Sequence, residues 1–169
     1  MKAKHKPSPP QTGFALLEVL IAVVVISFGL LGLAGLQLTS MKNNHSAYFR
    51  SIATQQAYDM ADRIRSNFAG IAAGNYSHVS GTPGDPGCIA TGCTPAQLAQ
   101  YDIDQWNTDN AALLPSGAGV VCIDSTPNAG TPGADGCDGI GAIYAVKVWW
   151  DDEKNPANPK RFVTSFMPL

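Results

Sequence analysis

Residues 14–36 read FALLEVLIAVVVISFGLLGLAGL, an almost wholly apolar run with one charged side chain, Glu18. As an α-helix this run would be about 35 Å long, enough to cross the ~30 Å hydrocarbon core of a bilayer. Lys2, Lys4 and Lys6 precede it, and such positive charges hold an N-terminus in the cytoplasm. The run is also longer than the apolar part of an ordinary secretory signal. The sequence therefore predicts a single-pass membrane helix whose C-terminal side is exported.

Glu18 is the feature that a plain membrane anchor leaves unexplained. An ionised carboxylate costs about 2.5–3.5 kcal/mol at the centre of a membrane helix, and less near its end. A side chain that reaches back to the membrane interface is the simpler alternative. We expect no catalytic role, because no second titratable group shares the apolar segment. Glu18 is therefore expected to have a partner.

The residues around Glu18 resemble a known processing signal. From Gly13 to Ile21 the chain reads GFALLEVLI, which is similar to the prepilin signature of type IV pilins and type II secretion pseudopilins. The resemblance implies cleavage after Gly13 by a membrane prepilin peptidase and methylation of the new amine of Phe14. It also implies that Glu18 faces the N-terminal amine of a neighbouring subunit in a filament. Ala15 departs from the Thr or Ser that often follows the phenylalanine.

The resemblance to one subclass extends further along the chain. Residues 58–67 (YDMADRIRSN), 97–102 (QLAQYD, followed by Trp106) and 146–152 (VKVWWDD) are similar to type IV pilus modification proteins, the PilV-like minor pilins. This implies a structural subunit, not an enzyme, that acts without a cofactor in pilus assembly and priming. Attachment, twitching motility and DNA uptake are what the resemblance implies for the whole machine.

The same resemblance implies partners and a location. The partners are the prepilin peptidase, other minor pilins, the major pilin, the inner-membrane assembly platform and membrane lipid. The protein is expected in the bacterial inner membrane, with a cytoplasmic N-terminus and a periplasmic C-terminal domain, and then in the filament or its tip. Two alternatives stay open: a type II secretion pseudopilin, and a signal-anchored binding domain or enzyme that does not polymerise.

The apolar run contains three glycines, Gly29, Gly32 and Gly35, and no proline. Many major pilins have a helix-breaking proline near the register of Gly35. Each glycine lowers helix propensity by about 1 kcal/mol relative to alanine. We therefore expect either local melting of the helix or close packing of a neighbouring helix at these positions.

The second half of the predicted helix is amphipathic. Between residues 48 and 68 the apolar side chains recur at spacings of three and four, which is typical of one helical stripe. The stripe consists of Phe49, Ile52, Ala53, Ala57, Met60, Ala61, Ile64 and Phe68. Asp59 and Arg63 are four residues apart and are expected to pair. Residues 39–68 are therefore predicted to pack on a globular domain, with a coiled coil to a second protein as the alternative.

The remainder, residues 69–169, is predicted to be a small globular domain. Thr94 followed by Pro95 is typical of a helix start, which predicts a short helix over residues 96–106. Apolar or alternating segments predict strands at residues 119–124, 142–150 and 161–166. The segments rich in glycine and proline, residues 75–94 and 126–139, are predicted to be loops.

The predicted organisation is thus a leader over residues 1–13, a transmembrane assembly helix over 14–38, an amphipathic helix over 39–68 and the domain over 69–169. The fold class is α+β, a pilin-like ladle with a long N-terminal helix packed on a small antiparallel sheet.

All four cysteines lie in the C-terminal domain: Cys88, Cys93, Cys122 and Cys137. An exported domain is in an oxidising compartment, which favours disulfides. Three pairings are possible, and the local pairs, Cys88 with Cys93 and Cys122 with Cys137, make the fewest geometric demands. Zinc bound by the four cysteines is a minor alternative, because the gap between Cys88 and Cys93 is within the spacing of zinc fingers and His78 is nearby; we expect no metal.

Two further features have less specific interpretations. Residues 135–139 (DGCDG) have some character of a calcium loop but lack its spaced acids, so a solvated turn is preferred. Trp149 and Trp150 are adjacent in a predicted strand and must face opposite sides. We expect one in the core and the other exposed, at a subunit contact or a ligand surface.

The charge argues against one class of function. Removing the first thirteen residues removes three lysines and no acid, which changes the formal net charge from −2 to −5. A general nucleic-acid surface needs clustered Lys and Arg. We therefore expect no general nucleic-acid binding.

Overall fold

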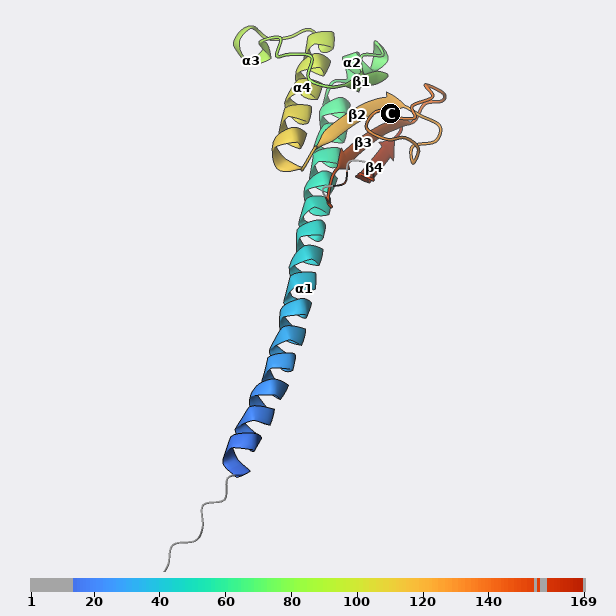
Figure 1. Cartoon of the computed structure of the whole chain (residues 1–169). Helices are drawn as coiled ribbons and strands as arrows, with labels where there is room; N and C mark the ends of the chain where they lie inside the picture. Colours follow the sequence, from blue (N-terminus) through green and yellow to red (C-terminus); the bar gives the residue numbers. More distant parts are fainter. Residues whose placement is uncertain (1–13, 154, 156–157, 169) are drawn as a thin grey trace, which may run out of the picture. The chain divides into compact units, whose positions relative to one another are not determined.

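The computed structural model describes residues 14–153, 155 and 158–168, with the side chains of residues 14, 15 and 91 excepted. The first element is the long helix α1, Phe14–Ser66 (Figure 1). The chain divides within this helix into two compact units, one ending at Asn44 and one beginning at His45. Each unit is described by itself.

The first unit consists of α1 up to Asn44. Every described side chain from Leu16 to Asn44 is exposed, including the large apolar ones. By length and composition, α1 is a helix that could cross a membrane. It is unbroken at all three glycines, so the predicted local melting does not occur in this structure.

The second part of α1 places its apolar stripe in the core of the second unit. Buried along it are Phe49, Ala53, Ala57, Met60, Ala61 and Ile64, and Ile52 is partly buried. On the outer side, Arg63 Nε donates to Asp59 Oδ2 at 2.7 Å, which confirms the predicted pair. The 3.6-residue period of this segment therefore positions the rest of the domain on one face of α1.

The prediction for Phe68 is wrong. α1 ends at Ser66, and a short helix, α2 (Phe68–Ala72), begins after Asn67, whose side chain accepts a hydrogen bond from the Gly70 amide. This cap redirects the chain, and Phe68 is 63% exposed. A break of one residue is enough to move the last member of the stripe off the core face.

The prediction of a helix over residues 96–106 is confirmed, but the predicted length is wrong. α4 runs Pro95–Leu113, and Thr94 forms a capping box with Gln97. The buried face continues through Asn107 and Asn110, polar residues that do not mark a helix face in the sequence. Asn107 donates to the Gly119 carbonyl and accepts from its amide, which fixes α4 against the sheet.

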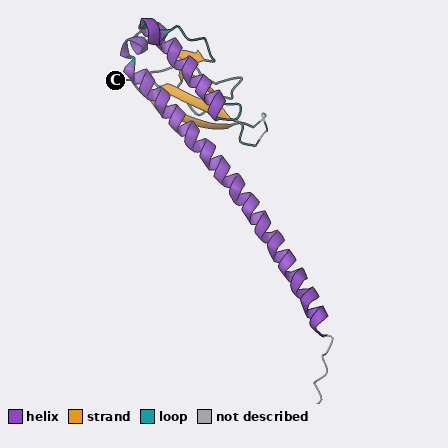
Figure 2. Ribbon diagram, turned by 90° about the vertical axis from the view of Figure 1, so that its left-hand side faces the viewer, coloured by secondary structure: helices purple, strands orange, loops and turns teal. Residues whose placement is uncertain are grey.

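The sheet has four antiparallel strands in the order β1-β2-β3-β4. Its strands are labelled in Figure 1 and coloured orange in Figure 2. The three predicted strands correspond to β2 (Ala118–Ile123), β3 (Tyr144–Trp150) and β4 (Lys160–Phe166). β1 (His78–Ser80) and the four-residue helix α3 (Cys88–Thr91) lie in a segment predicted as loop. The long helix on an antiparallel sheet confirms the α+β class.

Both faces of the sheet are covered. On one face, Tyr144, Val146, Val148 and Trp150 join the core made with α1 and α4. On the other, Trp149 packs with Val120 and Cys122 beneath Cys137. Trp149 and Trp150 therefore face opposite sides, but both are buried, at 1% and 3% exposed. The expected exposed tryptophan is wrong, because the loop that carries Cys137 covers its side of the sheet.

Candidate functional site

The apolar part of α1 carries the residues expected to act in processing and assembly. Gly13 lies outside the described residues, and Phe14 is described only as the first residue of α1. Glu18 is exposed and lies among exposed apolar side chains, of which Leu17 and Val19 are 61% and 60% accessible. An apolar helix surface of this kind needs lipid or other protein around it. It also leaves the Glu18 carboxylate available to a group outside this unit.

The three glycines of this segment lie on an open surface. A methyl group added at Gly29, Gly32 or Gly35 would meet no atom within 4 Å. The positions are three residues apart, so they fall on neighbouring turns of one helical face. Small residues arranged in this way let a second helix approach closely. Because α1 is continuous at these glycines, close packing of a second helix stays the prediction for them.

In the second unit, two disulfides hold the loops. Cys88 is bonded to Cys93 and Cys122 to Cys137, which are the two local pairs. The second bond closes the loop that follows β2, and we call residues 124–139 the disulfide loop. It is rich in glycine and contains no strand longer than an isolated bridge between Thr131 and Ala134.

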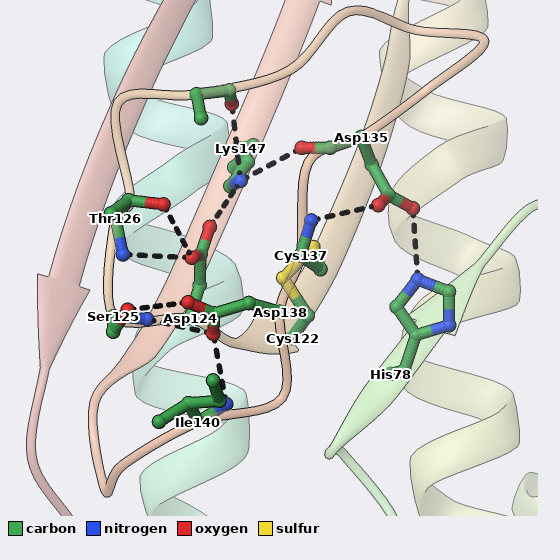
Figure 3. Close-up of a disulfide and its surroundings, with 11 residues drawn as sticks. His78, Cys122, Asp124, Ser125, Thr126, Asp135, Cys137, Asp138, Ile140 and Lys147 are labelled. Atoms are coloured by element: carbon green, nitrogen blue, oxygen red, sulfur yellow. Dashed lines mark hydrogen bonds and ion pairs between the residues drawn. A yellow bond between two sulfur atoms is a disulfide. The ribbon is translucent and has the colours of Figure 1, made fainter.

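A buried lysine anchors the disulfide loop (Figure 3). Lys147 projects from β3, and its Nζ lies 2.5 Å from Asp124 Oδ2, 2.8 Å from the Asp135 carbonyl and 3.1 Å from the Ala129 carbonyl. Both Lys147 and Asp124 side chains are 0% exposed. The ammonium donates to three acceptors, one at each end of the loop and one within it. A buried charge is tolerated only when it is paired and hydrogen-bonded in this way.

The electrostatics of Asp124 follow from this contact. Burial alone would raise the pKa of its carboxyl, but the hydrogen bonds from Lys147 and from the Thr126 amide outweigh burial and lower the pKa below its usual value. Arg161 of β4 adds a second clamp, donating to the carbonyls of Gly130 and Asn128. The loop is thus fixed mainly through its backbone carbonyls.

Aspartates within the loop complete its fixation. Asp135 accepts from the Cys137 amide at 3.1 Å, and its other oxygen lies 2.8 Å from Nε2 of His78 in β1. Asp138 accepts from the amides of Ser125 and Ile140. These carboxylates accept hydrogen bonds from backbone amides of the loop and so help to fix its path.

A second polar network lies between α1, α4 and the segment before β1. The Tyr76 hydroxyl donates to Asp102 Oδ2 at 2.6 Å, and Asn67 Nδ2 donates to the Tyr76 oxygen at 3.0 Å. Burial raises the pKa of the Asp102 carboxyl, against the opposing effects of Tyr76 and Arg63. Burial likewise raises the pKa of Tyr76, with Asp102 adding to it. The network links α4 to Asn67, the residue that follows α1, and to the segment before β1.

Neither network was predicted from the sequence. A signal existed for Lys147, since it is a single charge in a strand whose other residues, YAV-VWW, are apolar on both faces. No comparable signal exists for Tyr76 and Asp102, which are far apart in the chain. The predicted assembly residues and the disulfide loop lie in different units.

Comparison with known families gives two matches in adjoining segments. Residues 9–34 match the prokaryotic N-terminal methylation motif, and residues 35–104 match a model described as type IV pilin Tt1218. No significant match is found among curated proteins or among solved structures. With a long N-terminal helix packed on a four-stranded antiparallel sheet, these matches show that the chain belongs to the type IV pilin superfamily. It is a pilin-like subunit.

Membership in this superfamily has direct consequences. Pilins are structural proteins, and the prepilin motif implies processing by a peptidase and assembly with other pilins. The methylation motif and the apolar helix are features of a membrane-anchored pilin.

Proposed function

We propose that this chain is a minor pilin of a type IV pilus. It is made as a prepilin, cut between Gly13 and Phe14, and methylated on the new amine of Phe14. The proposal is supported by the basic leader and by the match of residues 9–34, which spans the junction, to the N-terminal methylation motif. Leader removal leaves an apolar helix that begins with a free amine.

The observation that carries the proposal is one carboxylate on an otherwise apolar, exposed helix. Glu18 lies four residues after Phe14, about 6 Å along the helix axis. In a bundle of parallel helices offset by about one turn, the Phe14 amine of one subunit would come level with Glu18 of the next. An ion pair there would neutralise two charges that are each expensive to bury. The pair therefore favours one stagger between subunits over others.

The segments of the chain have roles that follow from this contact between subunits. Residues 14–38 form the membrane and assembly helix, residues 39–68 carry the domain, and residues 69–169 form the surface displayed outside the membrane. We propose that the N-terminus is cytoplasmic and the domain periplasmic, because Lys2, Lys4 and Lys6 flank the apolar run. Two disulfides accord with an oxidising compartment.

We assign the subunit to the minor pilins that prime assembly, on the resemblance of residues 58–67 and 146–152 to PilV-like proteins. Its partners would be the prepilin peptidase, the other minor pilins, the major pilin and the inner-membrane assembly platform. Attachment, twitching motility and DNA uptake would be properties of the assembled filament. A pseudopilin would share the N-terminal chemistry, and deletion separates the two, since it would abolish piliation in one case and protein secretion in the other.

The experiment uses two substitutions in the full-length chain. Gly13→Leu should leave the leader attached, and Glu18→Val should be processed normally, remain in the membrane and fail to enter filaments. Glu18→Asp, which keeps the charge on a shorter side chain, is the matched control and should retain more incorporation than Glu18→Val. Normal processing of Gly13→Leu together with normal incorporation of Glu18→Val would refute the assembly mechanism.

A further inference from the structure

Four side chains of metal-binding type converge at one end of the disulfide loop (Figure 3). His78 of β1 lies directly opposite Cys122 of β2 in the antiparallel register. Residues paired in this way project to the same face of a sheet, with Cβ atoms about 4.5–5.5 Å apart. The imidazole and the Cys122 sulfur therefore share the face that the disulfide loop covers.

The loop brings the other two residues to the same place. Asp135 Oδ2 lies 2.8 Å from His78 Nε2. One donor atom each from His78, Asp135 and Cys137 lie within 4.8 Å of one another, and the Cys137 sulfur is bonded to Cys122. Asp124 is also within 4.8 Å of both sulfurs, but it is already bound to Lys147. Asp135 is therefore the carboxylate available for a second role.

We propose that, when the Cys122–Cys137 disulfide is reduced, these two cysteines bind one Zn²⁺ ion together with His78 and Asp135. A dithiol reductant supplies two electrons and two protons, so that the disulfide opens to two thiols and the dithiol becomes a disulfide. Zn²⁺ then replaces one proton on each thiol. Exchange with another disulfide would reverse both steps: the two thiolates form the Cys122–Cys137 bond and release the ion, and the other disulfide takes up their two electrons and two protons from water to become a dithiol.

The ligand chemistry fits zinc. Two thiolates, an imidazole and a carboxylate form a four-coordinate set, with bonds of about 2.3 Å to sulfur and about 2.0–2.2 Å to nitrogen and oxygen. A tetrahedral centre with these bonds needs donor atoms roughly 3.4–3.8 Å apart. The donor atoms of His78, Asp135 and Cys137 lie within 4.8 Å of one another, so they would move closer together when the ion binds, and Cys122 would join them once its bond to Cys137 is opened. His78 is 58% exposed, which gives the ion a path from solvent.

The site would give the loop the same anchor in two redox states. In the oxidised state the disulfide joins β2 to the end of the loop, and in the reduced state the metal would join the same residues and add β1 through His78. A domain that has been exported but not yet oxidised would thus already have its loop in place. The interpretation does not depend on the role of the chain in a pilus.

The test uses full-length protein in detergent in which Cys88→Ser and Cys93→Ser remove the other pair. After reduction with a phosphine, which does not chelate zinc as a thiol would, competition with a chromogenic chelator should show one Zn²⁺ bound per chain. Substitution by Co²⁺ should give the sulfur-to-cobalt charge-transfer and visible bands of a tetrahedral thiolate site. The oxidised protein should show neither.

The ligands are tested by His78→Ala and by Asp135→Asn, each on this background. Each should weaken zinc binding by at least about tenfold, and circular dichroism of the oxidised variants should show an unchanged fold. Zinc binding by both variants that is as tight as that of the background protein would mean that the thiols alone hold the ion and would overturn the site. Absence of stoichiometric binding by the reduced protein, or equal binding when Cys122 and Cys137 are the pair replaced by serine, would also overturn it.

Discussion

Lys147 Nζ lies 2.5 Å from Asp124 Oδ2, and neither side chain is exposed to solvent. The pair joins the middle of β3 to the first residue of the disulfide loop. Because the ammonium also donates to the carbonyls of Ala129 and Asp135, one side chain sets the path of a loop that has almost no secondary structure. The loop in turn buries Trp149.

Replacement of Lys147 by methionine should destabilise the domain strongly. Lys147→Met leaves the Asp124 carboxylate buried without its counter-charge, held only by its hydrogen bonds from Thr126, and breaking a buried pair costs about 3–5 kcal/mol. The double variant Lys147→Met/Asp124→Leu should recover much of that loss. Urea unfolding of the domain, followed by tryptophan fluorescence, measures both. If Lys147→Met were as stable as the double variant, the Asp124 carboxylate would cost nothing to bury without Lys147, and the prediction would be wrong.

The two buried aspartates should give opposite dependences on pH. The lowered pKa of Asp124 means that the unfolded state binds more protons, so its contribution is full above the usual value of about 3.9 and is lost as the pH falls through the folded-state pKa. The raised pKa of Asp102 has the reverse sign, and its contribution is lost as the pH rises above that usual value.

Single amide variants separate these contributions. When the pH falls from about 7 to about 3, the free energy of unfolding of the parent protein should decrease relative to that of Asp124→Asn. Relative to that of Asp102→Asn, it should increase. Urea unfolding at several pH values provides the measurement. The same trend in both variants would contradict the assigned signs.

The contact between α4 and β2 should not tolerate a methyl group at Gly119. A Cβ there would lie 2.2 Å from the Trp106 ring, which is held by the bond from its Nε1 to the Gln56 carbonyl at 2.8 Å. Gly119→Ala should therefore cost about 1–3 kcal/mol. Gly133→Ala, where no atom lies within 4 Å, is the matched control and should change stability little. Equal unfolding midpoints would show that Trp106 moves freely.

The two disulfides should differ in their contribution to stability. Cys122 and Cys137 are 15 residues apart, and Cys88 and Cys93 are 5 apart. A chain-entropy model gives about 3 kcal/mol for the longer loop and about 2 kcal/mol for the shorter one. Replacing the longer pair by alanine should thus lower the unfolding midpoint more. A larger effect from the shorter pair would mean that Lys147 and Arg161 hold the disulfide loop without its bond.

The sequence predicts best where one period or one charge pattern dominates. The helix, the capping residues Thr94 and Pro95, and three of four strands follow from spacing, propensity and capping chemistry. β1 and α3 were missed because three or four residues are too few to show a period. The predicted length of α4 is too short, because its last turns bury two asparagines, Asn107 and Asn110, of which Asn107 bonds to the backbone of Gly119 in β2.

The side-chain networks could not be predicted from the sequence, for a different reason. The exposure of a tryptophan was predicted from the strand alternation alone, and the loop that covers Trp149 shows no recognisable pattern. In the sequence His78 is nearest to Cys88 and Cys93 among the cysteines, but in the fold it lies beside Asp135, because β1 pairs with β2. Such contacts depend on strand register, which is set by the fold as a whole.

The central claim is that the mature chain begins with a processed amine that Glu18 of a neighbouring subunit can meet. Mass spectrometry of the N-terminal peptide, from both membrane and filament fractions, tests it directly. The account predicts a chain that begins at an N-methylated Phe14. A chain that still carries Lys2, Lys4 and Lys6 in both fractions would contradict it.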